Sequence, residues 1–499
     1  MISSAPTLPA FERTDSVGNV LRSPQRLLRE SLAGIMTALA LVPEVISFSF
    51  VSGVSPEVSL LSSVALGLVM SLLGGRSAMV TAAAGSVALV IGPSVDAHGV
   101  QYVLPTVLLA GAIQIAFGAL GLARVMRYVP RSVALGFVNA LGILIFMAQV
   151  PHVLKTSLAV WFLFLVTLAI VHWGPRLTRN VPAPLVAIAI VTLVAVAADL
   201  RVPNVGGGRD MHVGWPLLSL QSAPLDLTTL RLIWPTALSV AFVGLLESLL
   251  TAKLVDDLTD SRSNKNRESW ALGVANVCAA CLGGIGGCAM IGQTVVNVEL
   301  GGARTRVSTC VTALVLLLLV TGLSRVLAQI PMVTLAAVMM VVALKTVNWN
   351  SLKPSSLRRM PLPETAVMLL TVALTVGTGN LAFGVAGGVL LATILFARRV
   401  AHVIDARRTL HADGGAVRYD VHGPVFFASS GQLVERFAYA EDPPLVSVDF
   451  THAQIWDASS VAALDRIESR YRQLGTAVTF SGLDARSREF YGRLTGQLD

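Results

Sequence analysis

Long apolar segments recur along this 499-residue chain as far as Arg398, and no other feature of the sequence constrains its fold as strongly. The stretch STCVTALVLLLLVTGL at 308–323 is an example, because it approaches the length of a membrane crossing and carries no charge. Charged residues make up 13% of the chain, whereas soluble proteins carry about 25%. The sequence therefore predicts a polytopic α-helical membrane protein.

Apolar stretches bounded by charges, proline or glycine predict fourteen spans, centred near residues 39, 64, 88, 110, 139, 164, 191, 243, 274, 295, 314, 338, 371 and 390. The composition changes near Arg398, where long apolar runs stop and charged residues become frequent. We therefore expect an N-terminal segment at 1–30, a transmembrane domain at 31–400 and a soluble domain at 408–499.

The basic residues are unevenly distributed among the predicted loops. If the N-terminus is cytoplasmic, most lysines and arginines up to Arg408 fall in cytoplasmic segments. The basic residues of the outside segments are few: Lys155, Arg201, Arg209, Arg231 and Arg325. The positive-inside rule then predicts a multi-pass protein of the cell (inner) membrane with both termini in the cytoplasm. The net charge of +8 reflects this topology, so we expect no nucleic-acid partner.

Two pairs of features recur at nearly the same spacing. Glu44 and Glu247 each interrupt an apolar span, and they lie 203 residues apart. The third and tenth spans begin with small residues and become helix-forming at Gly85 and Gly292, which lie 207 residues apart. This spacing predicts two repeats of seven spans, about 31–200 and 230–400. An odd number of spans inverts the second copy, as in many secondary transporters.

Half-helices that begin in mid-membrane are natural anion sites. Their first N–H groups are unpaired and the positive end of the helix dipole is exposed. We expect two such ends to face each other and bind a small anion. The predicted substrate-binding residues are Ser47, Gly85, Ser86, Gly292, Gln293 and Thr294. The alternative is that the glycines only allow close packing of helices.

The two buried glutamates are candidate proton carriers. An ionised carboxylate inside a membrane costs on the order of several kcal/mol unless it finds a partner or a proton. A proton on Glu44, the first choice, would offset the charge of an incoming anion. The alternative for Glu44 is a hydrogen bond to backbone freed by Pro43. For Glu247, a contact with Thr251 or with a sodium ion competes.

Several stretches resemble the SulP anion permeases, the sulfate permease and prestin-type solute carriers, in a bacterial-type form. They are AGIMTALALVPEVISFSFVSGVSPEVSLLSS (33–63), LLESLLTAKLVDDLTDSRSNKNRESWALGVANV (245–277) and AMIGQTVVNVELGGARTRVS (289–308). DFTHAQIWDASSVAALDRI (449–467) resembles a STAS domain, the cytoplasmic module of that family. The resemblance covers nearly the whole chain.

This resemblance implies seven plus seven inverted spans, divided into a core and a gate domain that move in an elevator-like manner. It also implies homodimers, and sulfate, bicarbonate, halides or dicarboxylates as substrates. Many animal members carry an arginine where this chain has Gln293, so a fixed positive charge is missing there. Sodium-coupled bicarbonate members have aspartate where this chain has Glu247, although Thr251 is retained, which leaves a sodium site open.

The C-terminal part predicts strands at 416–428, 444–450 and 476–483, with a helix after Asp457. Alternation of strands and a helix indicates a small α/β domain. Asp457 or Ser459 would cap the helix, and Ser459 matches a serine that is phosphorylated in related anti-sigma-factor antagonists. The alternative to this regulatory role is that the residue serves only as a helix cap.

No Ser/His/Asp arrangement, metal-ligand spacing or Walker motif is found in the sequence, so we expect no enzyme, cofactor or ATP-driven pump. The main hypothesis is a proton-coupled secondary transporter for small anions, with a slight preference for carboxylates or dicarboxylates. Sodium-coupled transport of bicarbonate or sulfate is the first alternative. An anion channel or exchanger is the second.

Overall fold

The computed structural model separates into two compact units, Met1–Val389 and Leu390–Asp499. The residues that it describes are 16–154, 156–177, 182–207, 223–224, 226–411 and 415–496.

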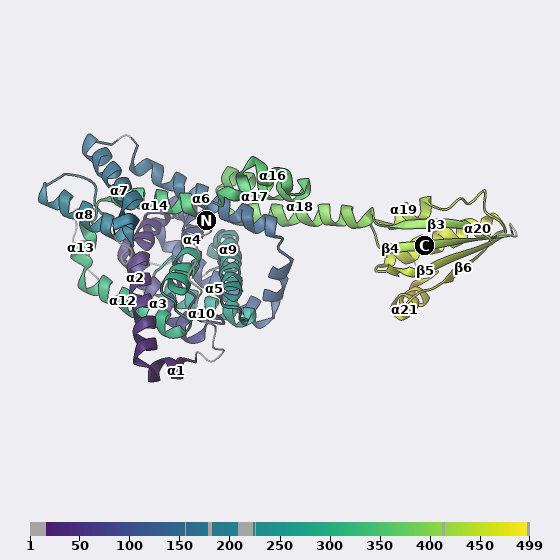
Figure 1. Cartoon of the computed structure of the whole chain (residues 1–499), viewed down its shortest axis with the longest axis horizontal. Coiled ribbons are helices and arrows are strands. Elements are labelled where there is room, and N and C mark those ends of the chain that lie inside the picture. Colours follow the sequence, from purple (N-terminus) through teal and green to yellow (C-terminus); the bar gives the residue numbers. More distant parts are fainter. Residues whose placement is uncertain are drawn as a thin grey trace, which may run out of the picture. The chain divides into compact units, whose positions relative to one another are not determined.

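Helices make up nearly all of the first unit (Figure 1). In chain order its elements are α1 (Val17–Arg22), α2 (Pro24–Ser52), α3 (Pro56–Leu73), β1 (Thr81–Ala83), α4 (Gly85–His98), α5 (Val103–Ala119), α6 (Arg131–Gln149), α7 (Leu158–Leu177), α8 (Ala183–Ala197), α9 (Leu227–Thr259), α10 (Lys265–Cys281), β2 (Gly287–Ala289), α11 (Ile291–Val295), α12 (Arg306–Gly322), α13 (Ser324–Ala328), α14 (Met332–Thr346), α15 (Trp349–Leu352), α16 (Pro354–Arg359), α17 (Leu362–Thr378) and the start of α18 (Leu381–Ala401). A π-helical segment, Val296–Leu300, continues α11.

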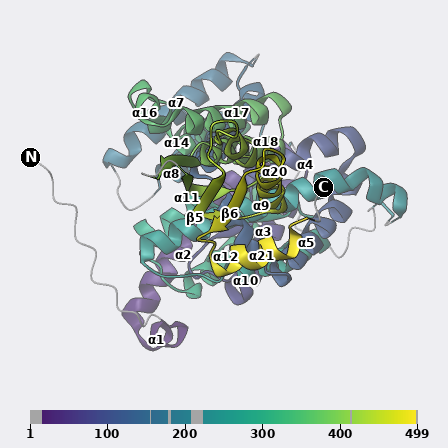
Figure 2. The ribbon, with the colours of Figure 1, turned by 90° about the vertical axis from the view of Figure 1, so that its right-hand side faces the viewer.

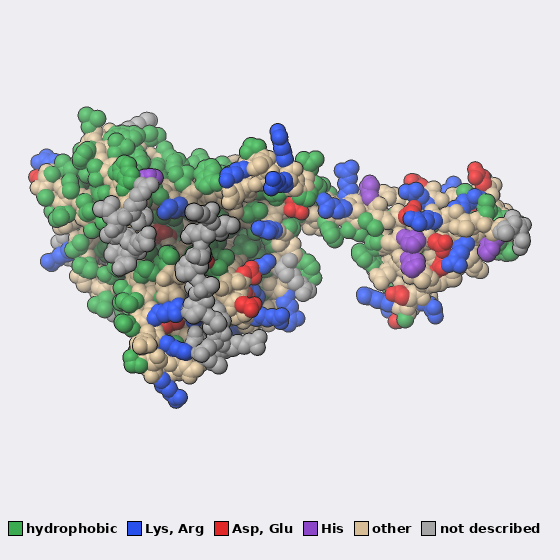
Figure 3. Space-filling model, viewed as in Figure 1, with side chains coloured by type: hydrophobic (Ala, Val, Ile, Leu, Met, Phe, Trp, Pro, Cys, Tyr) green, Lys and Arg blue, Asp and Glu red, His purple; other side chains and the backbone are tan. Residues whose placement is uncertain are grey.

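All fourteen predicted span centres lie inside helices of this structure. Among the described residues, 6 helices are long and apolar enough to cross a membrane, and shorter apolar helices accompany them. Hydrophobic side chains cover much of the visible face of this unit, as expected for contact with lipid (Figure 3). The exact number of crossings stays a prediction.

The helices pack as two groups. The core group contains α2, α3, α4, α5, α9, α10, α11 and α12, and Figures 1 and 2 show α2, α3 and α12 beside one another. The gate group contains α6, α7, α8, α14 and α17. Each group has its own buried apolar cluster, around Leu66 and Leu272 in the core group and around Leu163 and Val333 in the gate group. The two groups meet where α14 and α8 approach α2 and where α6 approaches α4.

Small residues decide how closely the core helices pack. α5 and α10 cross at Gly111 and Gly273, where a Cβ added to Gly273 would lie 2.5 Å from the Gly111 carbonyl oxygen. Close backbone approach of this kind is the usual role of glycine between membrane helices. The packing role weighed for glycine therefore holds at α5 and α10, away from the predicted site.

The C-terminal unit is a four-stranded sheet with the order β3-β4-β5-β6. Its elements are β3 (Asp405–Leu410), β4 (Ala416–Val425), α19 (Ser430–Glu435), β5 (Leu445–Ile455), α20 (Ala458–Gln473), β6 (Ala477–Ser481) and α21 (Ala485–Leu494). β3 pairs antiparallel with β4, and the other two pairs are parallel. The three predicted strands correspond to β4, β5 and β6, whereas β3 was not predicted.

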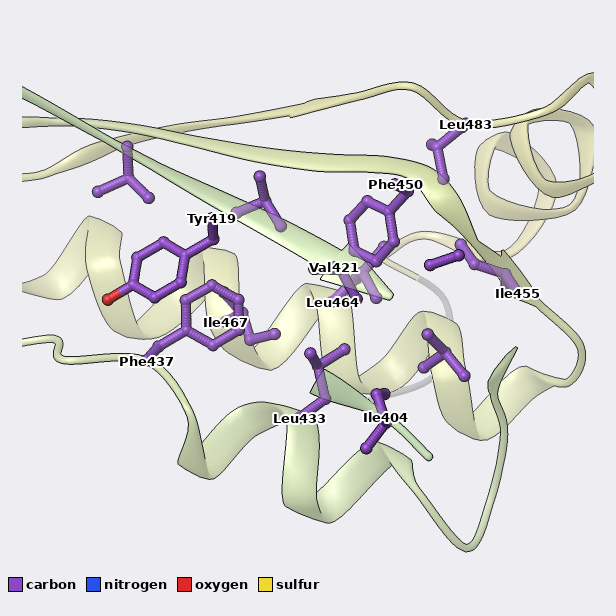
Figure 4. Packing of buried hydrophobic residues seen from close by; sticks show 14 of the residues in the cluster. Ile404, Tyr419, Val421, Leu433, Phe437, Phe450, Ile455, Leu464, Ile467 and Leu483 are labelled. Atoms are coloured by element: carbon purple, nitrogen blue, oxygen red, sulfur yellow. The ribbon is translucent and has the colours of Figure 1, made fainter. Parts of the chain in front are cut away.

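Alternate residues of β4 and β5 form the core of this unit, which Figure 4 shows around Tyr419, Phe437 and Phe450. The other face of the sheet is polar, and Figure 3 shows acidic, basic and histidine side chains gathered on this unit. This alternation explains why a pattern of period two identifies the strands in the sequence.

Asp442 is the polar centre of the C-terminal unit. Its fully buried carboxylate accepts hydrogen bonds from the hydroxyls of Tyr419, at 2.7 Å, and of Tyr471. Arg408 Nε lies 2.8 Å from the same carboxylate. Burial raises the pKa of Tyr471, so its hydroxyl stays protonated and donates.

We expect Asp442→Ala to destabilise this unit by about 3 kcal/mol, because two buried hydroxyls lose their acceptor. Hydrogen exchange of β4 and β5 in the full-length protein would measure the loss of protection. Asp405→Ala is the matched control, since Asp405 pairs with Arg407 at 3.3 Å on the surface. Such an exposed pair contributes at most about 1 kcal/mol. Equal protection in both variants would contradict the prediction.

Candidate functional site

The two predicted repeats meet at a short antiparallel ladder. β1 pairs with β2 in the register Thr81↔Ala289 and Ala83↔Gly287. A helix follows each strand almost at once: α4 begins at Gly85, as predicted, and α11 begins at Ile291, one residue before the predicted position. Antiparallel pairing is what two repeats of opposite orientation would produce.

Buried polar side chains hold this ladder in place. The Asn276 side chain accepts a hydrogen bond from the Gly287 N–H at 2.7 Å and donates to the Gly287 carbonyl at 3.2 Å. The Thr294 hydroxyl accepts from the Val80 N–H at 3.0 Å, which ties α11 to the residue before β1. The hydroxyl of Thr294, predicted to bind substrate, is therefore engaged by the backbone of the chain itself.

Glu247 lies on α9 beneath the ladder and is enclosed by donors of the chain itself. Its carboxylate accepts hydrogen bonds from the Ser86 hydroxyl and, at 3.1 Å, from the Cys288 thiol. The Thr251 hydroxyl donates to the backbone carbonyls of Glu247, at 2.8 Å, and of Ala289, at 3.0 Å. Glu247 thus joins α9 to the beginnings of both half-helix segments.

A cavity of about 880 Å³ lies between the core and gate groups. From the core group it is lined by Pro43 and Glu44 of α2, and Gly292 and Gln293 of α11 also reach it. α6, α8 and α14 of the gate group line the opposite side, and most of the lining residues are apolar. A cavity of this size with few polar groups is typical of a site for a small ligand.

Glu44 is the buried carboxyl of this cavity. Only 8% of its surface is exposed, and it interacts with the side-chain amide of Gln293, which is 5% exposed. Within the described part of the chain it makes no hydrogen bond to the backbone freed by Pro43. Gln293 is therefore the side chain that contacts the Glu44 carboxyl within the described residues.

The other predicted substrate residues do not line the cavity. The Phe48 ring covers the start of α4, where a Cβ on Gly85 would lie 2.5 Å from the ring. Ser86 bonds to Glu247, and the buried hydroxyl of Ser47 has no hydrogen-bond partner among the described residues. Gly292 differs from Gly85, because a Cβ there would meet open space. The two half-helices thus make unequal contributions to the cavity.

Lys345 lines the cavity and was missed as a site residue in the sequence. It lies in the last turn of α14, and its charge was assigned to a cytoplasmic loop because it follows an apolar span. A lysine in the last turn of an apolar helix is the sequence signal that could have indicated it. Among the described lining residues, Glu44 and Lys345 are the only ionisable ones.

The sequence profile of the sulfate permease family matches residues 27–160 and 152–371, and that of the STAS domain matches 407–494. The chain belongs to the sulfate permease family. A candidate sulfate transporter of Bacillus subtilis, YbaR, is 42% identical over 461 residues, which are 92% of this chain and 95% of that protein. The bicarbonate transporter BicA of Picosynechococcus is 27% identical over 74% of this chain and 70% of its own length. This member of the sulfate permease family is therefore a membrane protein that transports small anions.

Solved structures share the fold of this member of the sulfate permease family. The murine Solute Carrier 26 family member A9 anion transporter, in its inward-facing state, aligns with a TM-score of 0.82 at 16% identity, over 99% of this chain and 92% of its own. The transmembrane domain of a cyanobacterial BicA aligns with a TM-score of 0.66 at 24% identity, over 74% of this chain and 97% of that one. At these identities the likeness concerns the fold.

In the STAS domain, Asp457 is the N-cap of α20. Its carboxylate accepts a hydrogen bond from the Ser460 N–H at 3.0 Å and another from the Ser460 hydroxyl at 2.8 Å. Ser459 lies half-buried in the first helical turn. Of the two predicted caps, Asp457 is the one used, and phosphorylation of Ser459 stays a prediction.

Proposed function

We propose that this permease carries a small anion together with a proton, and that Glu44 carries the proton. The position of Glu44 supports this most directly, because a buried carboxyl on a cavity wall can reach both ligand and solvent. The charged group that acts on Glu44 from within the core group is Glu247, and Lys345 lines the same cavity from the gate group. An ionised Glu44 would repel an anion, whereas a protonated one would admit it.

The movement that we propose is elevator-like, with the core group carrying Glu44 and Gln293 past the gate group. Its support is that the cavity lies where the two helix groups meet. Entry of one proton with one monoanion adds no net charge to the moving unit, which lowers the cost of crossing the membrane. Assembly as a homodimer stays a prediction.

For the substrate we propose a small oxyanion, either a carboxylate or dicarboxylate or an inorganic anion such as bicarbonate or sulfate. Gln293 and the apolar walls of the cavity suit a compact anion with one or two acceptor oxygens. No arginine is among the described residues of the wall, so a bidentate clamp for a second carboxylate is not provided there.

Sodium coupling through Glu247 and Thr251 is less well supported. The carboxylate of Glu247 and the hydroxyl of Thr251 already have partners within the chain. A sodium ion would have to displace the Ser86 and Cys288 hydrogen bonds to gain ligands. The ionisable Glu44 on the cavity wall favours a carrier over a channel.

Uptake into proteoliposomes would test the proposal. Radiolabelled bicarbonate, sulfate, chloride and succinate would be offered under an imposed proton gradient, an imposed sodium gradient, or neither. We expect accumulation of at least one of these anions when the outside is acidic, and none that depends on sodium. Accumulation that follows sodium alone, or flux that never exceeds equilibrium, would contradict proton coupling.

A further inference from the structure

Lys345 is a basic residue on the cavity wall that has no role in the predicted repeat or in the proposed proton transfer. Lys345 is exposed in the last turn of α14, and its side chain lines the cavity. Within the described ranges its ammonium group makes no hydrogen bond and no ion pair, so it does not neutralise Glu44. An unpaired charge on the wall of a cavity attracts ligands of opposite charge into it.

The usual structural role of such a lysine is filled by other residues. Lysine near a helix C-terminus often bonds the last free carbonyl groups. In α14 the Leu344 carbonyl accepts from the Trp349 indole N–H at 2.6 Å, and the Val342 carbonyl accepts from the Thr346 hydroxyl at 3.0 Å. Lys345 is therefore not needed to cap the helix, and its charge is available to a ligand.

We propose that Lys345 supplies the fixed positive charge of the anion site, from the gate group, and makes the cavity selective for a single negative charge. The inference rests on the proposed function. With Glu44 protonated, Lys345 leaves the described wall of the cavity with one positive charge, which matches a monoanion. With Glu44 ionised, the two charges cancel and the attraction for an anion is lost.

The positive charge of Lys345 and the polar side chains of the core group lie on different helix groups. Gln293 and Glu44 line the cavity from α11 and α2, whereas Lys345 lines it from α14 of the gate group. An anion in the cavity would then be held by both groups at once. Its affinity should fall when the groups move relative to each other, which favours release after the movement.

Exchange at equal pH on both sides tests Lys345 without relying on proton coupling. The probe is whichever of radiolabelled bicarbonate, sulfate, chloride or succinate the wild type exchanges best. We expect Lys345→Gln to raise KM roughly five- to tenfold, with the maximal rate within about twofold, because one partly screened charge is lost. Lys345→Arg should restore KM, and higher salt should raise the KM of the wild type more than that of Lys345→Gln.

Lys353→Gln is the matched control. Lys353 is exposed in the segment that follows α14, where it donates to Asn350 at 2.9 Å, and it does not line the cavity. An unchanged KM in Lys345→Gln, or an equal rise in Lys353→Gln, would overturn the inference. The proposed function fails separately, if the wild type shows no proton-driven accumulation while Lys345→Gln still has a raised KM.

Discussion

Replacing Glu44 with glutamine is expected to abolish proton-driven accumulation while anion exchange continues. Glutamine keeps the size of the buried side chain and its interaction with Gln293, and resembles the protonated acid, so the cavity still admits an anion. A side chain that cannot release a proton cannot couple flux to a gradient. One pH unit supports up to about tenfold accumulation of a monoanion carried with one proton, and this ratio should fall to about 1.

Glu247→Gln distinguishes the two glutamates. Glu247 is also buried, at 6% exposure, but it lies with Ser86 and Cys288 beneath the ladder and does not line the cavity. Its glutamine variant should lower the amount of folded protein and keep the pH dependence of uptake. The assignment of the proton to Glu44 is wrong if Glu44→Gln keeps its pH dependence, or if only Glu247→Gln loses it.

The fold class can be predicted from the sequence because membrane-spanning segments are recognised by their length and apolar composition. Each predicted span centre lies in a helix, including those near residues 88 and 295, where the helices are short or irregular. The predicted repeat rests on the nearly equal spacing of the two glutamates and of the two glycines, and it stays a prediction. β3 could not be predicted, because the residues of Asp405–Leu410 are mostly exposed and do not alternate between apolar and polar.

The site was only partly predictable, because a repeat in the sequence does not require a symmetric cavity. Glu44, Gly292 and Gln293 meet in the cavity, as expected from their places in the spans. Gly85 is instead covered by Phe48, and no pattern in the sequence says which ring will lie on which glycine. Lys345 comes from a different helix group, so only the tertiary packing brings it to Glu44's cavity.

The second large effect, a loss of stability, is expected at Gly287, in the ladder that joins the two predicted repeats. A Cβ added there would lie 2.0 Å from the carbonyl oxygen of Ala82, the residue next to its partner in the register. Backbone cannot yield as a flexible side chain does, so β1 and β2 would have to separate. We expect Gly287→Ala to destabilise the folded transporter by about 3 kcal/mol, at the upper end of overpacking effects, and to lower its melting temperature in detergent.

Gly292→Ala is the matched control, because it adds the same methyl group five residues later at a position without steric crowding. A Cβ at Gly292 meets nothing within 4 Å, and alanine favours a helix over glycine by about 1 kcal/mol. Its melting temperature should therefore equal or exceed that of the wild type. If Gly287→Ala melts like the wild type, the repeats are not joined at this ladder. Asn276 bonds both backbone groups of Gly287, so loss of the ladder in Gly287→Ala should also cost these two hydrogen bonds. The Asn276 amide would keep its hydrogen bond to the Gln114 side chain, at 2.7 Å, and the two lost bonds would add to the destabilisation.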